Sequence, residues 1–113
     1  MSVRIILVDD YDAIRQAQRR ILETESDFEI VGEACNGRKA IELVEQLRPD
    51  AVIIDINMPE INGIEATRII HQSHPEVKVI SYSSHSEKAY VLDMMRAGAS
   101  GYVLKQSHVS EIS

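Results

Sequence analysis

The chain has 113 residues, of which 44% are apolar, and its formal net charge is −6. This length corresponds to one ordinary domain with a single hydrophobic core and leaves no room for a second domain. The acidic balance argues against nucleic-acid binding by this segment, because contact with phosphates relies on clustered Lys and Arg.

Cysteine usage and hydrophobic patterning argue against a disulfide-linked protein and against a secreted or membrane-spanning one. Cys35 is the single cysteine, so it cannot form an internal disulfide, and we expect it to be a small buried side chain. The chain contains neither a signal peptide nor an apolar run of about 18 residues. We therefore predict a cytoplasmic protein that does not contact the membrane.

The first third of the chain predicts a strand, a helix and a second strand. Val3–Val8 is a short β-branched run with little alternation, as expected for a parallel strand covered on both faces. From Asp10 onward, apolar residues recur at steps of three and four, which indicates an amphipathic helix ending near Ser26 and Asp27. Phe28–Ala34 is the second predicted strand.

A second helix and the most apolar strand follow. A turn precedes an apolar helical stripe over residues 40–47, and Pro49 helps to stop this helix. Ala51–Ile54 is the most apolar stretch of the chain, and Pro59 and Gly63 break the chain just after it. This pattern predicts a central strand followed by a functional loop.

The remaining elements continue the alternation. They are a helix over Ile64–His74, a strand over Val77–Tyr82, a helix over Glu87–Ala97 and a strand over Gly101–Leu104. Alternation of strand and helix predicts a parallel sheet with helices on both faces and right-handed crossovers. We therefore expect an α/β fold of the flavodoxin-like, doubly wound type, with five strands in the order 2-1-3-4-5.

Polar residues of reactive type stand at the ends of four of these strands. They are Asp9 and Asp10 after the first strand, Asp55 after the third, Ser83 after the fourth and Lys105 after the fifth. The carboxyl ends of parallel strands meet at one edge of the sheet, and the first and third strands flank the switch point where such sheets bind ligands. The spacing therefore predicts one site containing three carboxylates, a hydroxyl group and an ammonium group.

Three carboxylates in one place call for a compensating cation. Two unit charges about 4 Å apart repel by roughly 4 kcal/mol at an effective dielectric constant of about 20. An all-oxygen site favours a hard ion such as Mg2+, which also bridges to phosphate. A carboxylate beside such an ion can attack phosphorus as a nucleophile, while Lys105 would neutralise charge on the transferring oxygens and Ser83 would donate a hydrogen bond to one of them.

At these residues the chain resembles the receiver domain of two-component response regulators, whose fold is the CheY-like form of the flavodoxin-like sheet. The resemblance covers nearly the whole chain. It rests on five features in order: the pair Asp9-Asp10, Asp55 in I-I-D-I-N-M-P, Gly63, Ser83 in V-I-S-Y-S-S-H, and Lys105 in G-A-S-G-Y-V-L-K.

The resemblance implies how a phosphoryl group and a metal would be held. Asp55 would accept the phosphoryl group from a partner histidine kinase. Asp10 and Asp55 would bind Mg2+ directly, together with the backbone carbonyl of Asn57, and Asp9 would hold the metal through a water molecule. Lys105 would assist the transfer.

The resemblance also implies a switch and a means of setting its lifetime. Ser83 and Tyr102 would form the switch pair, in which the hydroxyl group moves toward the phosphoryl group and the aromatic ring turns inward behind it. Asn57 and His85 each lie two residues after a site residue. In receivers, side chains at such positions can tune how fast the acyl phosphate hydrolyses.

Two segments are most similar to the NarL/FixJ (LuxR-type) transcription regulators, N-G-I-E-A-T-R after the phosphorylation loop and A-G-A-S-G-Y-V-L-K near the end. This similarity implies that residues 1–113 form the receiver domain and that a C-terminal helix-turn-helix domain, absent here, contacts DNA. Receivers normally finish with a fifth helix, which would barely have begun at His108 before the chain stops at Ser113. We expect truncation of this helix to leave the domain marginally stable or to favour homodimers.

Each candidate residue also has a plainer structural interpretation. In that interpretation Asp9 and Asp10 cap the first helix, Asp55 is a solvated strand-end residue, Ser83 is a turn or cap residue, Lys105 is a surface lysine and Tyr102 fills the core. The histidines lack metal-ligand spacing and are expected on the surface; they are His71, His74, His85 and His108.

Two alternative functions remain. A stand-alone receiver would use the same site in a phosphorelay or to dock on another protein. An aspartyl-phosphate hydrolase of the haloacid dehalogenase type would place a second acid two residues after the nucleophile, where this chain has Asn57. We therefore predict that the chain is not an enzyme but a phosphoacceptor domain that assists its own phosphorylation and dephosphorylation.

Overall fold

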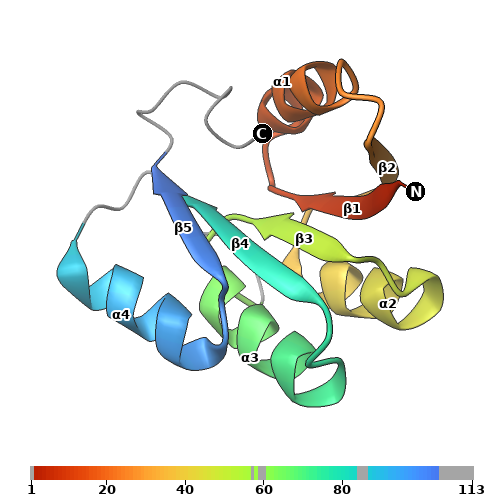
Figure 1. Ribbon diagram of the computed structural model, residues 1–113. Helices are drawn as coiled ribbons and strands as arrows, with labels where there is room; N and C mark the ends of the chain where they lie inside the picture. Colours follow the sequence, from red (N-terminus) through yellow and green to blue (C-terminus); the bar gives the residue numbers. More distant parts are fainter. Residues whose placement is uncertain (1, 57, 59–60, 84–86, 105–113) are drawn as a thin grey trace.

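The computed structural model describes residues 2–56, 58, 61–83 and 87–104 (Figure 1). Strands and helices alternate along this part of the chain, as predicted. The strands are β1 (Val3–Val8), β2 (Phe28–Ala34), β3 (Ala51–Ile54), β4 (Lys78–Ser83) and β5 (Gly101–Leu104). The helices are α1 (Asp12–Leu22), α2 (Gly37–Leu47), α3 (Gly63–Ser73) and α4 (Lys88–Ala97).

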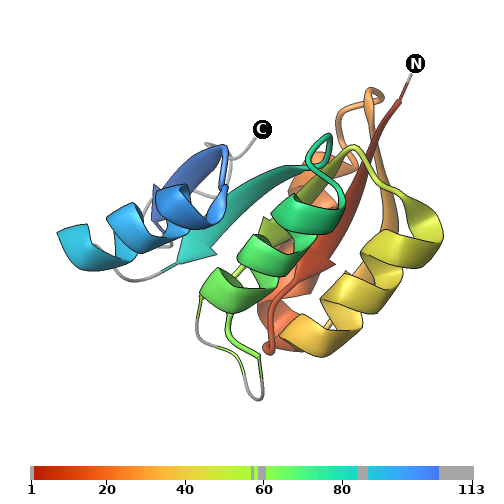
Figure 2. The same ribbon diagram turned by 90° about the horizontal axis from the view of Figure 1, so that it is seen from below.

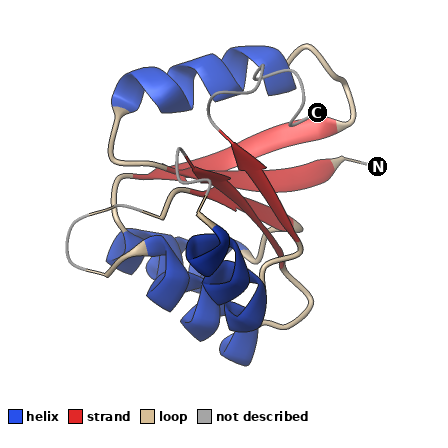
Figure 3. Ribbon diagram, turned by 90° about the vertical axis from the view of Figure 1, so that its left-hand side faces the viewer, coloured by secondary structure: helices blue, strands red, loops and turns tan. Residues whose placement is uncertain are grey.

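The strands form one parallel sheet in the order β2-β1-β3-β4-β5. Helix α1 covers one face of this sheet, and α2, α3 and α4 cover the other (Figure 1, Figure 3). Figure 2 shows α2, α3 and α4 lying side by side across their face. The predicted doubly wound fold is confirmed, and β1 and β3 are neighbours at the point where the strand order changes direction.

Each face of the sheet packs a separate apolar layer, and β1 contributes to both. Ile6 and Val8 belong to the core under α2, α3 and α4, whereas Ile5 and Leu7 belong to the core under α1. Strand β3 is buried at every position. Because side chains alternate between two covered faces, β3 is apolar throughout and β1 is apolar from Ile5 to Val8. The carboxyl edge of the sheet is therefore held by well-packed strands.

Several element boundaries differ from the sequence prediction, most of them by a single residue. Two of these differences have a clear physical reason. Helix α1 ends at Leu22, earlier than Ser26 and Asp27, because the chain turns there through hydrogen bonds from Thr24 N to Ile21 O (3.3 Å) and from Glu25 N to Leu22 O (3.1 Å). Strand β4 runs to Ser83, one residue beyond the predicted end, because the ladder with β5 continues to the pair Ser83 and Leu104. Ser83 is therefore the last residue of the strand.

The structure contradicts the expected solvent exposure of Cys35 and of His74. Cys35 is exposed, because it follows the edge strand β2 and precedes the cap of α2. His74 is buried where the chain passes from α3 to β4, and its Nε2 lies 2.8 Å from Glu45 Oε2 of α2. His71, by contrast, is exposed as expected.

The expected fifth helix, from His108 onward, lies outside the described residues. Among the described residues, no helix is long and apolar enough to span a membrane.

The loop after β3 depends on the close approach of Gly63. Its N–H group donates a hydrogen bond to the Ile56 carbonyl at 2.8 Å, which closes the loop onto the end of β3. A Cβ atom at Gly63 would lie 1.9 Å from the backbone carbonyl oxygen of Asp55. Because this obstacle is backbone rather than a flexible side chain, Gly63 is required here for space.

We therefore predict that Gly63→Ala destabilises the fold, whereas Gly101→Ala does not. A Cβ atom at Gly101 would meet nothing within 4 Å. Overpacking typically costs roughly 1–3 kcal/mol. We therefore expect the free energy of unfolding in urea to be lower by about this amount or more in Gly63→Ala than in wild type. Equal unfolding free energies for the two variants would contradict the proposed close approach.

Candidate functional site

Asp9, Asp10 and Asp55 lie together at the carboxyl edge of the sheet. Asp9 and Asp10 follow β1, Asp55 follows β3, and these neighbouring strands are in register with Val8 opposite Ile54. The hydrogen bond from Asp55 N to Val8 O, at 3.0 Å, continues the ladder to the acidic residue. Carboxylate oxygens from the three residues lie within 4.8 Å of one another. The predicted acidic cluster is confirmed.

The three carboxylates differ in burial. Asp9 is 1% exposed and Asp55 is 5% exposed, whereas Asp10 is exposed. Asp55 Oδ1 accepts a hydrogen bond from the N–H group of Ile56 at 2.8 Å, and Asp9 Oδ1 accepts one from that of Tyr11 at 3.0 Å. These bonds to backbone amides orient the two buried carboxylates.

This donor set fits a hard divalent cation. Carboxylate oxygens from two strand ends converge, and the exposed Asp10 leaves one side of the cluster open to water. Mg2+ typically binds one or two carboxylates and keeps several waters, which this mixture of buried and exposed oxygens allows. The cluster is typical of the Mg2+ site of receiver domains.

The plainer interpretation of the acidic pair is wrong. The N-cap residue of α1 is Tyr11, and it makes no side-chain capping hydrogen bond. Neither Asp9 nor Asp10 therefore occupies the capping position. Likewise, Asp55 is buried and is not a solvated strand-end residue.

Ser83 and Tyr102 lie on neighbouring strands, with Ser81 of β4 opposite Tyr102 of β5. Ser83 is fully buried, and the N-cap residue of α4 is Glu87, so Ser83 is not the cap of that helix. The ring of Tyr102 packs against the core under α2, α3 and α4.

The hydroxyl group of Tyr102 interacts with the site. Burial raises the pKa of Tyr102 above its ordinary value of 10.0, and a hydrogen bond with the side chain of Ser83 opposes this rise. The charges of Glu87, Asp55 and Tyr90 raise the pKa further, because they repel the phenolate. Tyr102 is therefore more than core filling, since its hydroxyl group is linked to Ser83 and lies within the electrostatic influence of Asp55.

Three predicted site residues fall outside the described part of the chain. They are Lys105, Asn57 and His85.

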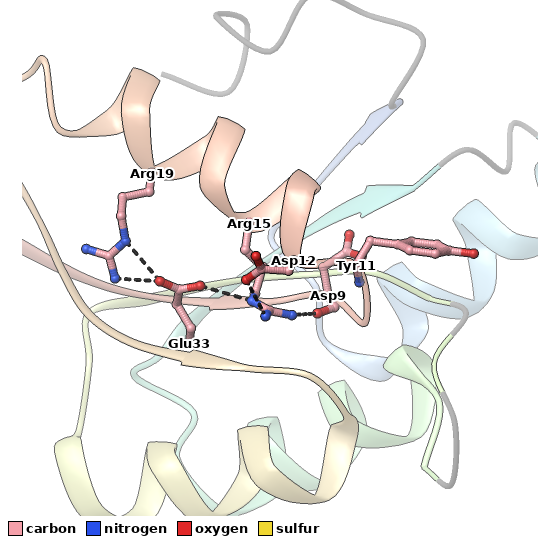
Figure 4. A network of polar contacts seen from close by, with 6 residues as sticks. All are labelled: Asp9, Tyr11, Asp12, Arg15, Arg19 and Glu33. Atoms are coloured by element: carbon pink, nitrogen blue, oxygen red, sulfur yellow. Dashed lines mark hydrogen bonds and ion pairs between the residues drawn. The ribbon is translucent and has the colours of Figure 1, made fainter.

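Sequence reasoning missed Arg15, which lies beside the acidic turn. Its guanidinium group donates to the backbone carbonyl of Asp9, to Asp12 and to Glu33 of β2 (Figure 4). The spacing of Asp12 and Arg15 is that of a helical ion pair and was a usable signal. No signal in the sequence indicated the contact between Arg15 and Glu33, because this contact depends on how α1 packs against β2.

Comparison with known proteins assigns the chain to a family. Residues 5–113 match the family described as response regulator receiver domain. Transcriptional regulatory protein DegU of Brevibacillus brevis is 44% identical over 105 residues, which cover 93% of this chain and 44% of that protein. The chain thus spans less than half the length of this relative.

Two further proteins are similar over almost the whole chain. Chemotaxis protein CheY of Thermotoga maritima is 38% identical, and the match covers 99% of this chain and 92% of that protein. The crystal structure of a LuxR-family two-component response regulator from an Aurantimonas species superposes with a TM-score of 0.94 at 37% identity, covering 99% of this chain and 80% of the other.

The family is one of non-enzymatic signalling domains, so the hydrolase alternative is excluded. Its relatives include DNA-binding regulators of the NarL/LuxR type, as the sequence resemblance predicted. The chain therefore belongs to the response regulator receiver domain family.

Proposed function

We propose that Asp55 accepts a phosphoryl group from a sensor histidine kinase in a Mg2+-dependent reaction, and that this event switches a C-terminal DNA-binding domain. One observation carries the proposal. A buried, oriented carboxylate at the end of β3 lies within 4.8 Å of two further carboxylates at the switch point of a receiver sheet. Such an arrangement brings a nucleophile and the ligands of a hard cation together.

The proposed transfer is a substitution at phosphorus. An oxygen of the Asp55 carboxylate forms a bond to the phosphorus of a phosphohistidine on the kinase, and the P–N bond breaks. The electron pair of that bond stays on the imidazole nitrogen, which then takes a proton from water. Because Ile56 N–H holds Asp55 Oδ1 at 2.8 Å, the carboxylate enters the reaction in a fixed orientation.

The remaining site residues have assigned roles. Asp10, Asp55 and the backbone carbonyl of Asn57 would hold Mg2+ directly, and Asp9 through water. When bound, this ion neutralises charge on the transferring oxygens. Lys105 would pair with one of those oxygens and Ser83 would donate a hydrogen bond to another.

We assign Asn57 and His85 to the control of how long the phosphoryl group persists. Both flank the reacting residues in sequence, and either side chain could shield the acyl phosphate from water.

The switch itself would couple Ser83 to Tyr102. A serine hydroxyl group can donate one hydrogen bond while it accepts another. Ser83 could thus bind the phosphoryl group while keeping its hydrogen bond with Tyr102. A local charge change at Asp55 would then bias the position of an aromatic ring at β5.

The output of the switch distinguishes two candidates. Regulation of transcription is favoured by the DegU relative, which is a transcriptional regulatory protein extending well beyond the matched segment. A stand-alone receiver is favoured by the CheY relative, of which the match covers 92%. The reading frame downstream of Ser113 decides between them, since only the first candidate requires a helix-turn-helix domain there.

Incubation with acetyl phosphate and Mg2+ is predicted to add one phosphoryl group to the wild-type chain, detected by intact mass. Asp55→Asn removes the nucleophile and is expected to abolish the adduct. Asp93→Asn, an exposed position on α4, is the matched control and is expected to retain it. Chelation of Mg2+ by EDTA is expected to prevent labelling.

Two results would contradict this assignment. One is the absence of an adduct on the wild-type chain at saturating Mg2+. The other is an undiminished adduct on Asp55→Asn.

Ser83→Ala is predicted to raise the pKa of Tyr102 further, because the hydrogen bond with Ser83 lowers that pKa. NMR titration of ring-labelled tyrosine, with Tyr102→Phe to assign the signal, measures the change. The folded state favours the neutral phenol of Tyr102, because the pKa of this group is raised above its ordinary value of 10.0. The contribution of Tyr102 to stability is therefore present below pH 10.0 and is lost as the pH rises through the raised pKa. An unchanged Tyr102 titration in Ser83→Ala would contradict contact between the two hydroxyl groups.

A further inference from the structure

Arg15 of α1 is largely buried beside the turn that carries the acidic pair. Its side chain is 14% exposed. Its Nη1 donates to the Asp9 backbone carbonyl, its Nη2 lies 2.9 Å from Asp12 Oδ1, and its Nε lies 3.0 Å from Glu33 Oε1 (Figure 4). All three nitrogens of the guanidinium group are therefore engaged, one of them by the backbone of a cation-site residue.

Glu33 holds Arg15 in place. It lies on β2 opposite Leu7 of β1, and its Oε2 accepts hydrogen bonds from Arg19 Nε at 2.9 Å and Arg19 Nη2 at 2.7 Å. The next residue, Ala34, accepts the hydrogen bond from Asp9 N at 3.1 Å. Both backbone groups of Asp9 are thus tied to the segment of β2 that carries Glu33, the N–H group directly and the carbonyl group through Arg15.

The charge of Arg15 cannot itself favour a cation. A guanidinium group beside a divalent ion repels it, and this repulsion is reduced here because Glu33 and Asp12 pair with Arg15. Any benefit of Arg15 to cation binding must therefore come from geometry. The hydrogen bond to the Asp9 carbonyl is the contact that supplies it.

We propose that Arg15 is a positioning residue for the cation pocket. By linking the Asp9 carbonyl to the Glu33 side chain through its guanidinium group, it fixes the turn from which the carboxylates of Asp9 and Asp10 project. This inference rests on the proposed Mg2+ site. The competing interpretation is that the Arg15–Glu33–Arg19 network only fastens α1 to β2, as many ion pairs do.

The test measures the Mg2+ affinity of the whole chain in wild type and three variants. MgCl2 is added stepwise, and the amide chemical shifts of residues 9–12 report binding. Arg15→Lys keeps the positive charge but replaces the three nitrogens of the planar guanidinium group, each of which contacts a different acceptor, with a single nitrogen. Loss of a group that orients metal ligands typically weakens metal binding about 10- to 100-fold, and we expect Arg15→Lys to lie near the lower end of this range. Arg15→Met is expected to bind Mg2+ more weakly than wild type as well, although removal of the charge alone would strengthen binding.

Arg19→Lys is the matched control. Arg19 shares Glu33 with Arg15, and its remaining hydrogen bond goes to Glu23. We expect Arg19→Lys to lose stability in urea while its Mg2+ affinity stays close to that of wild type.

The outcomes separate this inference from the proposed function. Equal Mg2+ affinities for wild type and Arg15→Lys would overturn the positioning role and leave the Mg2+ site intact. Tighter binding by Arg15→Met would overturn it too, because charge would then dominate geometry. A wild-type chain that does not bind Mg2+ would overturn both the site and the role of Arg15.

Discussion

Oxygens of Asp9, Asp10 and Asp55 lie within 4.8 Å of one another, and ionised carboxylates at that distance repel. At an effective dielectric constant of about 20, each such pair costs roughly 3–4 kcal/mol. Asp9 and Asp10 are adjacent in the sequence, and the strand order brings Asp55 to them, because β1 and β3 are parallel neighbours that end at the same edge. The repulsion makes the edge receptive to a cation, and through the cation to a phosphoryl group.

The sheet is built to hold this unfavourable cluster. Burying one large aliphatic side chain contributes about 1.5–3 kcal/mol, so a few of the buried residues of β1 and β3 outweigh a repelling pair. Position matters as much as energy. The amide of Ile56 orients Asp55, the approach of Gly63 closes the loop after β3, and Arg15 ties down the turn after β1. Each contact restrains a segment that would otherwise relieve the repulsion by moving apart.

The sequence predicted the parts of the fold that depend on local pattern. β3 is apolar throughout, and β1 is interrupted only by Arg4, so the bounds of both strands were predicted correctly. The acidic cluster followed from their parallel arrangement. The end of β4 was misplaced, because it is set by pairing with β5 rather than by the composition of β4. His74 and Arg15 were misjudged for the same reason, since their partners Glu45 and Glu33 are distant in the sequence.

The central claim is that repulsion at the β1–β3 edge creates the cation site, and urea unfolding with and without Mg2+ at constant ionic strength tests it most directly. Ligand at about 100 times its Kd stabilises the folded state by about 2.7 kcal/mol, so Mg2+ should stabilise the wild-type chain by this order. Asp10→Asn, an exposed position, should be more stable than wild type without Mg2+ and should respond less to its addition. An unfolding free energy that is insensitive to Mg2+, together with an Asp10→Asn variant no more stable than wild type, would contradict the account.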